Sequence, residues 1–274
     1  MIFTLSCTGN TRWAAELLSR VTNDRVISIP EAVNGDCIYH LRAGERIGFC
    51  LPVHGWRLQP VVREFICKLK FVTQNAAGLH KGSPSPYCYF LITCGDSCGE
   101  YGDRLEEVLA AKGLEVRSCC SVIMPESYVG LPFMDVDTDL REAEKKMKAR
   151  GTVLEFADIV AENRSVRMPV CRGALPRFYS RVLGKFFYKF LITDKRFRVN
   201  ADKCIGCGMC KKHCPTGNVA MNGGKPEWLH TGSCMTCMAC YHYCPEKAIS
   251  FWKFTKNKGQ YYFDHNKTKR KNSR

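Results

Sequence analysis

Residues 204–215 read CIGCGMCKKHCP, and residues 234–245 read CMTCMACYHYCP. In each stretch three cysteines follow one another at two-residue gaps, a fourth comes three residues after the third, and a proline follows it. Thiolates are the soft ligands that iron–sulfur clusters require, and this run is typical of chains that hold two [4Fe–4S] clusters. The spacing therefore predicts two four-iron clusters.

The two runs are expected to exchange their fourth cysteines. Three sulfurs of a tight loop can face one cluster, whereas the fourth cysteine lies a turn further on and serves the other. One cluster would be held by Cys204, Cys207, Cys210 and Cys244, and the second by Cys234, Cys237, Cys240 and Cys214. Two zinc sites are the alternative, but zinc sites pair two CxxC elements across a longer gap and need no third cysteine at this spacing.

The cysteine usage also bears on the compartment. The chain has 274 residues and 18 cysteines, and those outside the two runs have no regular spacing. A secreted disulfide scaffold would be shorter and more evenly cross-linked. The first residues, MIFTLSCTGN, have no basic and apolar regions of a signal peptide, and no apolar stretch approaches the roughly 20 residues of a membrane-spanning helix. We therefore expect a cytoplasmic protein.

The N-terminus reads as a strand, a loop and a helix. The apolar run 2–5 leads into the loop Ser6–Thr11, and a helix-like segment follows with Trp13, Leu17 and Val21 on one face. Such a loop can cradle a phosphate, because backbone N–H groups and the helix dipole favour an anion there. It has no lysine, so it is not a Walker-type loop. A plain helix N-cap is the alternative.

Further strands and helices alternate through the first 163 residues. Strand-like runs lie at 26–29, 47–51, 87–93 and 115–124, and helix-like segments lie near 60–70, 101–112 and 138–163. This alternation predicts an α/β fold with a doubly wound parallel sheet. Ligands of such folds bind at the carboxyl ends of the strands, where the loops 6–11, 52–56 and 93–96 would meet.

At this point the sequence resembles a known family. SCTGNT at residues 6–11 is similar to the T/S-x-T-G-x-T phosphate loop of flavodoxins, and PVHGW at 52–56 is similar to their second loop. LITCGDSCGEYGDRL at 91–105, followed by MPESYV at 124–129, is similar to the third region of short bacterial flavodoxin-like domains. A flavodoxin-like domain followed by a small α+β two-cluster ferredoxin domain resembles the EFR1-type ferredoxin family of anaerobic bacteria. The resemblance covers nearly the whole chain apart from the tail.

The resemblance implies a bound FMN. Its phosphate would lie on one loop, and its ring would be bordered by the other two. The phosphate residues would be Ser6, Thr8, Gly9, Asn10 and Thr11, and the ring residues Pro52, His54, Gly55, Trp56, Thr93, Cys94, Gly95 and Asp96. Trp56 would either stack on the ring or anchor a half-buried loop. Cys7 stands where glycine is common in related loops.

Charge divides the chain into modules. Residues 1–163 carry 18 Lys/Arg and 21 Asp/Glu, residues 164–200 carry 10 and 1, and residues 251–274 carry 8 and 1. We therefore expect four segments. They are a flavodoxin-like domain at 1–163, a basic amphipathic connector at 164–198, a ferredoxin domain at 199–252 and a disordered basic tail at 253–274.

The connector contains a helix-like segment that begins at Pro176. Arg177, Arg181, Lys185 and Lys189 recur at four-residue spacing, beside a stripe of Phe178, Val182, Phe186 and Phe190. One interpretation is a helix packed between two domains with a solvated basic edge. The other is a docking face for an acidic redox partner or an anionic membrane surface.

These features predict electron transfer through two [4Fe–4S] clusters and an FMN, which would link one-electron and two-electron redox partners. Two alternatives stay open. The first is a flavin-dependent oxidoreductase that reduces a small molecule, and the second is a docking module whose flavodoxin-like half has lost FMN. No motif for nucleic-acid binding accompanies the positive charge, so no nucleic-acid partner is expected.

Overall fold

The computed structural model describes residues 1–42, 44–73 and 86–265. The first half is built on a five-stranded parallel sheet in the order β2-β1-β4-β6-β7. The strands are β1 (Ile2–Thr4), β2 (Val26–Ser28), β4 (Ile47–Pro52), β6 (Cys88–Cys94) and β7 (Val116–Ile123). Counted along the chain, this is the 2-1-3-4-5 order of flavodoxin-like folds, which confirms the predicted fold class.

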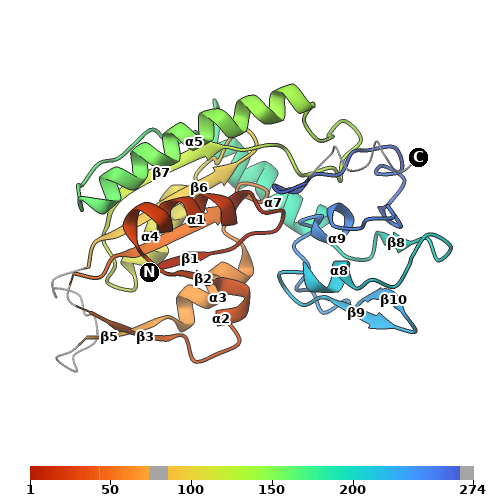
Figure 1. Ribbon diagram of the computed structural model, residues 1–274, viewed down its shortest axis with the longest axis horizontal. Helices are drawn as coiled ribbons and strands as arrows, with labels where there is room; N and C mark the ends of the chain where they lie inside the picture. Colours follow the sequence, from red (N-terminus) through yellow and green to blue (C-terminus); the bar gives the residue numbers. More distant parts are fainter. Residues whose placement is uncertain (43, 74–85, 266–274) are drawn as a thin grey trace.

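Helices cover both faces of the sheet (Figure 1). Consecutive strand residues point to opposite faces, so Ile2 joins one apolar core and Phe3 the other. The first core packs against α1 (Asn10–Thr22) and α5 (Asp139–Ala161), and the second packs against α3 (Pro60–Lys68) and α4 (Tyr101–Ala110). The strands and helices expected in this half are confirmed to within two residues at each end.

A short parallel pair lies beside this sheet and has no counterpart in the sequence prediction. It joins β3 (Ile38–Leu41) to β5 (Lys70–Thr73), and the short helix α2 (Ile29–Ala32) precedes it. Tyr39 and Phe71 from the pair pack around Phe3, with ring centroids 4.9 and 6.4 Å from it. The pair thus extends the second core beyond the edge of the main sheet.

The second half is a small domain with two antiparallel strand pairs. Its elements are β8 (Phe197–Val199), α8 (Met209–Lys212), β9 (Val219–Asn222), β10 (Lys225–Trp228), α9 (Ala239–His242) and β11 (Ile249–Phe251). β8 pairs with β11, and β9 pairs with β10. A separate apolar core forms around Phe197, Trp228 and Phe251. This small sheet-containing domain is the ferredoxin domain that the sequence predicted.

The predicted connector is divided between both domains and a helix. Residues 167–171 run beside β7, where Met168 N donates to Cys119 O (3.0 Å) and Cys171 N to Ser121 Oγ (2.7 Å). A continuous helix follows, formed by α6 (Pro176–Phe178), η1 (Tyr179–Leu183), α7 (Gly184–Phe186) and η2 (Phe187–Leu191). Residues 197–198 already belong to β8. The expected single connector at 164–198 is therefore corrected to the helix 176–191 with short flanks.

The expectation of a disordered tail from residue 253 is wrong for residues 253–265, and residues 266–274 lie outside the described residues. Tyr261 is 1% exposed, and its hydroxyl donates to Asn10 Oδ1 (2.6 Å). Phe263 N donates to Thr8 O (2.8 Å), and its ring stacks on Trp13 at 4.9 Å. The positive charge of this segment suggested disorder, whereas aromatic packing and hydrogen bonds anchor it to the first domain.

The two domains lie side by side, with the ferredoxin domain at the carboxyl ends of the parallel strands (Figure 1). His242 of α9 is buried and bridges them: its Nε2 lies 2.6 Å from Ser127 O, and its Nδ1 accepts from Tyr261 N at 3.1 Å. Across the described residues, every helix is too short or too polar to cross a membrane.

Candidate functional site

The first cysteine set surrounds one small cavity. Cys204, Cys207, Cys210 and Cys244 all line it, together with apolar side chains that include Met221 and Ile249. The cavity measures about 20 Å³. The structure thus brings together the four cysteines that the spacing assigned to one cluster.

The second set also converges. Cys240 lies close enough to Cys214, Cys234 and Cys237 for each to raise its pKa, although burial contributes most. Backbone N–H groups point at the sulfurs: Asn218 N donates to Cys214 Sγ at 3.2 Å, and Thr236 N donates to Cys234 Sγ at 3.3 Å. Hydrogen bonds of this kind stabilise thiolate charge and help to set the potential of a cluster.

The two cysteine loops have the same backbone conformation, which is energetically less favourable in the second loop. Gly206 and Gly208 have φ near +70°, and the equivalent Thr236 and Met238 have φ of 50° and 62°. Residues other than glycine rarely adopt this left-handed backbone conformation. In Thr236 the cost is offset, because its Oγ1 accepts from Thr193 N at 2.8 Å. The loop geometry is therefore kept even where glycine is absent.

The donor chemistry suits iron–sulfur clusters, because thiolates are their ligands. Each set offers four thiols and aims N–H groups at sulfur. Within residues 1–42, 44–73 and 86–265, no three His, Cys, Asp or Glu side chains converge on a point where one metal ion could bind. The four thiols of the first set line one cavity.

The predicted phosphate loop has the expected backbone. Gly9 has φ of 95° and precedes the 13-residue helix α1, and Ser6 Oγ accepts from Arg12 N at 3.1 Å. Its side chains are already engaged: Thr11 Oγ1 lies 2.8 Å from Thr93 Oγ1, and Asn10 Nδ2 donates to Pro125 O at 3.1 Å. The segment 261–263 covers the loop. A Cβ at Gly9 would lie 2.9 Å from the Cβ of Phe263.

The connector helix lies against the second loop. Trp56 stacks on Tyr179 at 5.3 Å and donates from Nε1 to Ser97 Oγ at 3.1 Å. Gly55 faces Phe187, whose ring would lie 2.6 Å from a Cβ added there. Trp56 therefore stacks on a ring of this chain and matches the alternative of a half-buried loop anchor.

The remaining ring-site residues are tied to protein groups. His54 Nδ1 accepts from Gln59 Nε2 at 3.1 Å, and the same amide group donates to Pro52 O at 2.6 Å. Burial lowers the pKa of His54 to about 4, so its ring is neutral near pH 7. Cys94 is buried, and burial raises its pKa.

The third loop is closed in the same way by neighbouring protein groups. Gly95 packs against Glu126 and accepts from Lys145 Nζ at 3.4 Å, and Asp96 O accepts from Cys171 Sγ at 3.3 Å.

The space that the three predicted FMN loops share is small. The cavity shared by the three loops measures about 80 Å³, whereas pockets for such ligands span about 300–1,000 Å³. Glu126 also lines the cavity, and burial raises the pKa of its carboxyl group. A second anion in so small a space would be repelled whenever this carboxyl is ionised. The predicted loops do meet at one edge of the sheet, but the chain's own side chains fill that edge.

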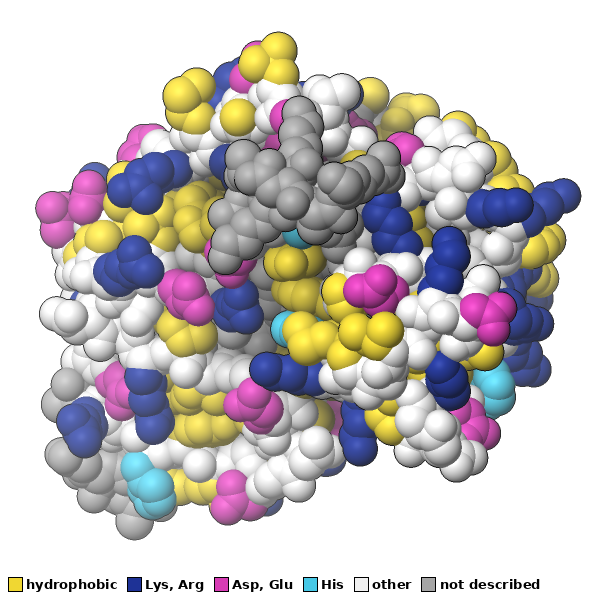
Figure 2. Space-filling view, turned by 45° about the vertical axis from the view of Figure 1, so that its right-hand side comes forward, with side chains coloured by type: hydrophobic (Ala, Val, Ile, Leu, Met, Phe, Trp, Pro, Cys, Tyr) yellow, Lys and Arg dark blue, Asp and Glu magenta, His cyan; other side chains and the backbone are white. Residues whose placement is uncertain are grey.

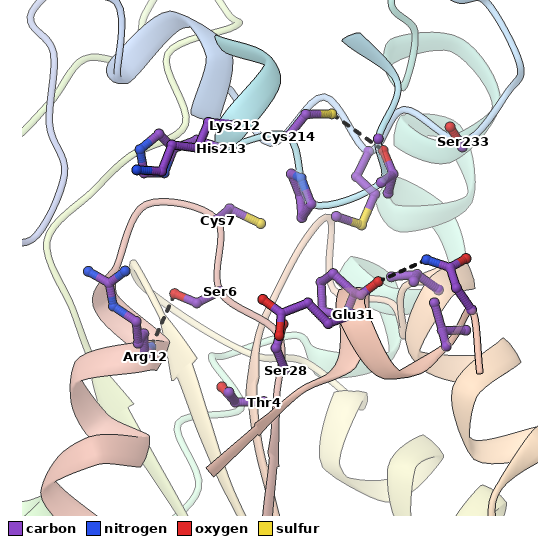
Figure 3. A pocket seen from close by; sticks show the side chains of 18 of the residues that line it. Thr4, Ser6, Cys7, Arg12, Ser28, Glu31, Lys212, His213, Cys214 and Ser233 are labelled. Atoms are coloured by element: carbon purple, nitrogen blue, oxygen red, sulfur yellow. Dashed lines mark hydrogen bonds between the residues drawn. The ribbon is translucent and has the colours of Figure 1, made fainter. Parts of the chain in front are cut away.

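A larger cleft lies beside the phosphate loop, between the domains. It measures about 760 Å³, and its walls include Ser6, Arg12, Glu31 and Lys212. Figure 3 shows Cys7 and Cys214 on its two sides, the first from the loop before α1 and the second from the ferredoxin domain. A predicted cluster ligand therefore borders an open space.

Cys7 joins the loop to the ferredoxin domain. Its thiol interacts with that of Cys237, an interaction that raises the pKa of Cys237. On the same side, His213 and Tyr243 stack at 3.6 Å, and Tyr243 stacks on Tyr262 at 4.5 Å. The predicted phosphate loop thus touches a predicted cluster ligand.

Sequence reasoning missed the residues that fill and cover the loops. They come from the connector helix, the segment before α5 and the C-terminal segment: Tyr128, Tyr179, Phe187, Tyr261 and Phe263. One signal was available. Four of these five aromatic residues lie on a basic connector or a basic tail, in segments with no other reason to be apolar.

Comparison with known families agrees with the second half of the structure. Residues 196–245 match the family of the 4Fe-4S dicluster domain. Such a domain implies two [4Fe–4S] clusters. The chain is therefore a flavodoxin-like α/β region followed by a 4Fe–4S dicluster domain.

Individual relatives share only parts of the chain. The uncharacterized protein MJ0749 of Methanocaldococcus jannaschii is 32% identical over 88 residues, which are 30% of this chain and 33% of that protein. A component of the ion-translocating oxidoreductase complex of Methanosarcina acetivorans is 41% identical over 46 residues, 17% of each protein. The chain thus spans a third or less of these relatives. The Trp repressor binding protein structure from Bacillus subtilis has 12% identity and a TM-score of 0.29, over 55% of this chain and 95% of that one.

Proposed function

We propose that this protein is a cytoplasmic one-electron carrier that works through two [4Fe–4S] clusters and without FMN. The observation that carries the proposal is the convergence of two sets of four thiols, the first around one cavity and the second within mutual electrostatic reach of Cys240. A bound [4Fe–4S] cluster exchanges one electron at a time. Cys204, Cys207, Cys210 and Cys244 would hold one cluster, and Cys214, Cys234, Cys237 and Cys240 the other.

The flavodoxin-like half serves as a platform in this proposal. Its ligand-binding edge receives the connector helix, the C-terminal segment and the second cysteine loop. These contacts hold the ferredoxin domain at a fixed orientation on the flavodoxin-like half. The chain would then represent a member of the EFR1-type ferredoxins in which the flavodoxin-like fold is kept for docking.

Redox proteins are the proposed donors and acceptors. Figure 2 shows the face on which the ferredoxin domain comes forward. Lys and Arg side chains gather along the right-hand edge of this face, and acidic side chains are dispersed over it. A positive surface steers acidic partners and speeds their encounter. Reduction by such a donor should slow as salt rises, because exposed charges are screened over about 8 Å at physiological ionic strength.

Anaerobic purification followed by iron, sulfide and flavin analysis tests the proposal. We expect about eight iron and eight sulfide per chain and no flavin. Added FMN should keep its free fluorescence. Zinc in place of iron would end the proposal, and stoichiometric quenching of FMN would restore the flavin that the resemblance implied.

The open cleft supports a second candidate function. A small oxidant bound there would border Cys214, one of the proposed ligands of the second cluster. The protein would then be an oxidoreductase that reduces this molecule. Steady turnover of a small oxidant by the reduced protein alone would favour this candidate over the pure carrier.

A further inference from the structure

The connector helix 176–191 exposes an apolar stripe to solvent. Phe178, Val182, Phe186 and Phe190 are 45%, 53%, 53% and 50% exposed, and they follow one another at four-residue spacing. The residues of the opposite face, Ser180 and Gly184, are buried against the flavodoxin-like domain. The helix is therefore anchored on one side and shows large apolar side chains on the other.

The winding of the helix keeps this stripe straight. An α-helix has 3.6 residues per turn, so residues four apart drift around it. The segments η1 and η2 are π-helical, with hydrogen bonds five residues apart and thus more residues per turn. The alternation of α and π segments brings the average close to four. As a result the apolar and basic side chains form two parallel rows.

The second row carries positive charge. Arg177, Arg181, Lys185 and Lys189 each precede a member of the apolar row, and all four are exposed. Arg181 is paired with Glu100 at 2.8 Å, and Arg177 also helps to lower the pKa of that carboxyl group. Among the described residues, no ion pair is formed by Lys185 or Lys189. Lys189 Nζ lies over the Phe190 ring at 5.2 Å.

We propose that this face, the two rows on helix 176–191, binds the surface of an anionic membrane. Phenylalanines of an amphipathic helix enter the boundary between headgroups and acyl chains, while Lys and Arg reach the anionic headgroups. Residues 164–193 contain no acidic residue that would repel the lipid. The helix would lie in the plane of the surface.

The proposal locates the carrier at a membrane surface and does not identify its redox partner. It does not depend on the clusters being the redox centre, because the helix lies outside both cysteine runs. A failure of membrane binding would leave the carrier function standing, and the absence of clusters would leave the lipid face standing.

Sedimentation of the purified holoprotein with vesicles tests it. Vesicles of phosphatidylcholine alone should bind little, and vesicles with added phosphatidylglycerol should bind the protein in a salt-sensitive way. The double variant Lys185→Gln/Lys189→Gln should lower the partition coefficient about thirtyfold, at roughly 1 kcal/mol per charge. The control Lys203→Gln/Lys253→Gln removes two exposed lysines that lie outside the helix and should change the partition coefficient little.

A second pair of variants tests the apolar row. Phe186→Ser/Phe190→Ser should lower the partition coefficient about tenfold or more. Leu229→Ser, which alters a ferredoxin side chain that is 48% exposed, is the control. Unchanged visible absorption of the clusters would show that each variant folds.

Three results would overturn the proposal. They are equal binding of neutral and anionic vesicles, no binding to either, and a parent protein that is dimeric until Phe186 and Phe190 are replaced. The last result would assign the face to a second copy of the chain. Binding to an acidic redox protein without binding to vesicles would assign it to that partner.

Discussion

The cysteine loops and the phosphate-loop edge both carry a ligand-binding pattern, and they differ in the space in front of it. In the ferredoxin domain four thiols surround a cavity, and backbone N–H groups are aimed at the sulfurs. At the edge of the parallel sheet the glycine turn and helix α1 are present, but Tyr179, Phe187 and Phe263 occupy the approach.

The difference shows what a motif can establish. A cysteine run carries its own ligands, so its chemistry is complete once the loop folds. A phosphate loop supplies only donors, and the rest of the site must be left open by segments elsewhere in the chain. The same backbone can therefore serve as a binding site in one protein and as a packing surface in another.

The largest effect is expected at the cysteine loops. Cys204→Ala removes a ligand of one cluster, so the variant should retain about four of the eight irons found in the parent protein. Cys7→Ala removes a thiol that touches a predicted ligand without being one, and it should retain all eight. Iron and sulfide analysis after anaerobic purification measures both. Equal losses in the two variants would contradict the assignment of ligands.

At the filled edge, the close approach of helix 176–191 can be broken with one methyl group. A Cβ at Gly184 would lie 2.6 Å from Gly55 O, so Gly184→Ala must displace the helix. The free energy of unfolding should fall by about 1–3 kcal/mol. Gly151→Ala is the matched control, because Gly151 lies in α5 with open space around it. That variant should gain about 0.5–1 kcal/mol, and urea unfolding compares the two.

The filled edge should also weaken in acid. Burial lowers the pKa of His54 to about 4, below its usual 6.5. Between these two values the unfolded chain binds a proton at His54 that the folded chain does not bind. This contribution to stability is complete above pH 6.5 and is lost as the pH falls toward 4. At pH 5 the loss should be about 2 kcal/mol.

Urea unfolding between pH 8 and pH 5 measures the effect. His54→Leu should flatten the pH dependence, and His40→Leu, at an exposed site, should leave it unchanged. If the free energy of unfolding depends on pH equally in the parent protein and in His54→Leu, the His54 ring is solvated.

The smallest effect is expected where the C-terminal segment meets the phosphate loop. Tyr261→Phe leaves the buried Asn10 Oδ1 without its donor and should cost about 1 kcal/mol of stability. Tyr262→Phe is the control, since the Tyr262 ring stacks on Tyr243 but its hydroxyl does not bond to this loop. A gain of FMN binding in Tyr261→Phe would show that the segment alone excludes the flavin.

Much of the fold was predictable because it depends on local pattern. The strands of the parallel sheet are apolar runs such as 47–51, and α1 begins at a glycine turn, so both follow from periodicity. The spacing also predicted that Cys204, Cys207, Cys210 and Cys244 lie together, and they line one cavity. The pairing of β3 with β5 was not predictable, because its strands are short and its partners are distant in sequence.

The outcome at the phosphate loop was unpredictable for a related reason. Whether Gly55 faces a flavin or Phe187 depends on where a helix 130 residues later is placed. A local motif contains no information on such a placement. The ordering of residues 253–265 likewise depends on contacts with Trp13 and Asn10 at the other end of the chain.

That last contact has a consequence for the order of folding. Tyr261 and Asn10 are 251 residues apart, and the pair Arg12 and Asp264, at 3.1 Å, are 252 apart. Contacts of such separation carry a large loop-closure cost and form late. A ribosome releases the phosphate loop before both cysteine runs and residues 261–264 after them, so the loop stays uncovered while the runs are made. Closure over the loop therefore marks a chain whose cysteine runs have already been made and had the opportunity to receive iron.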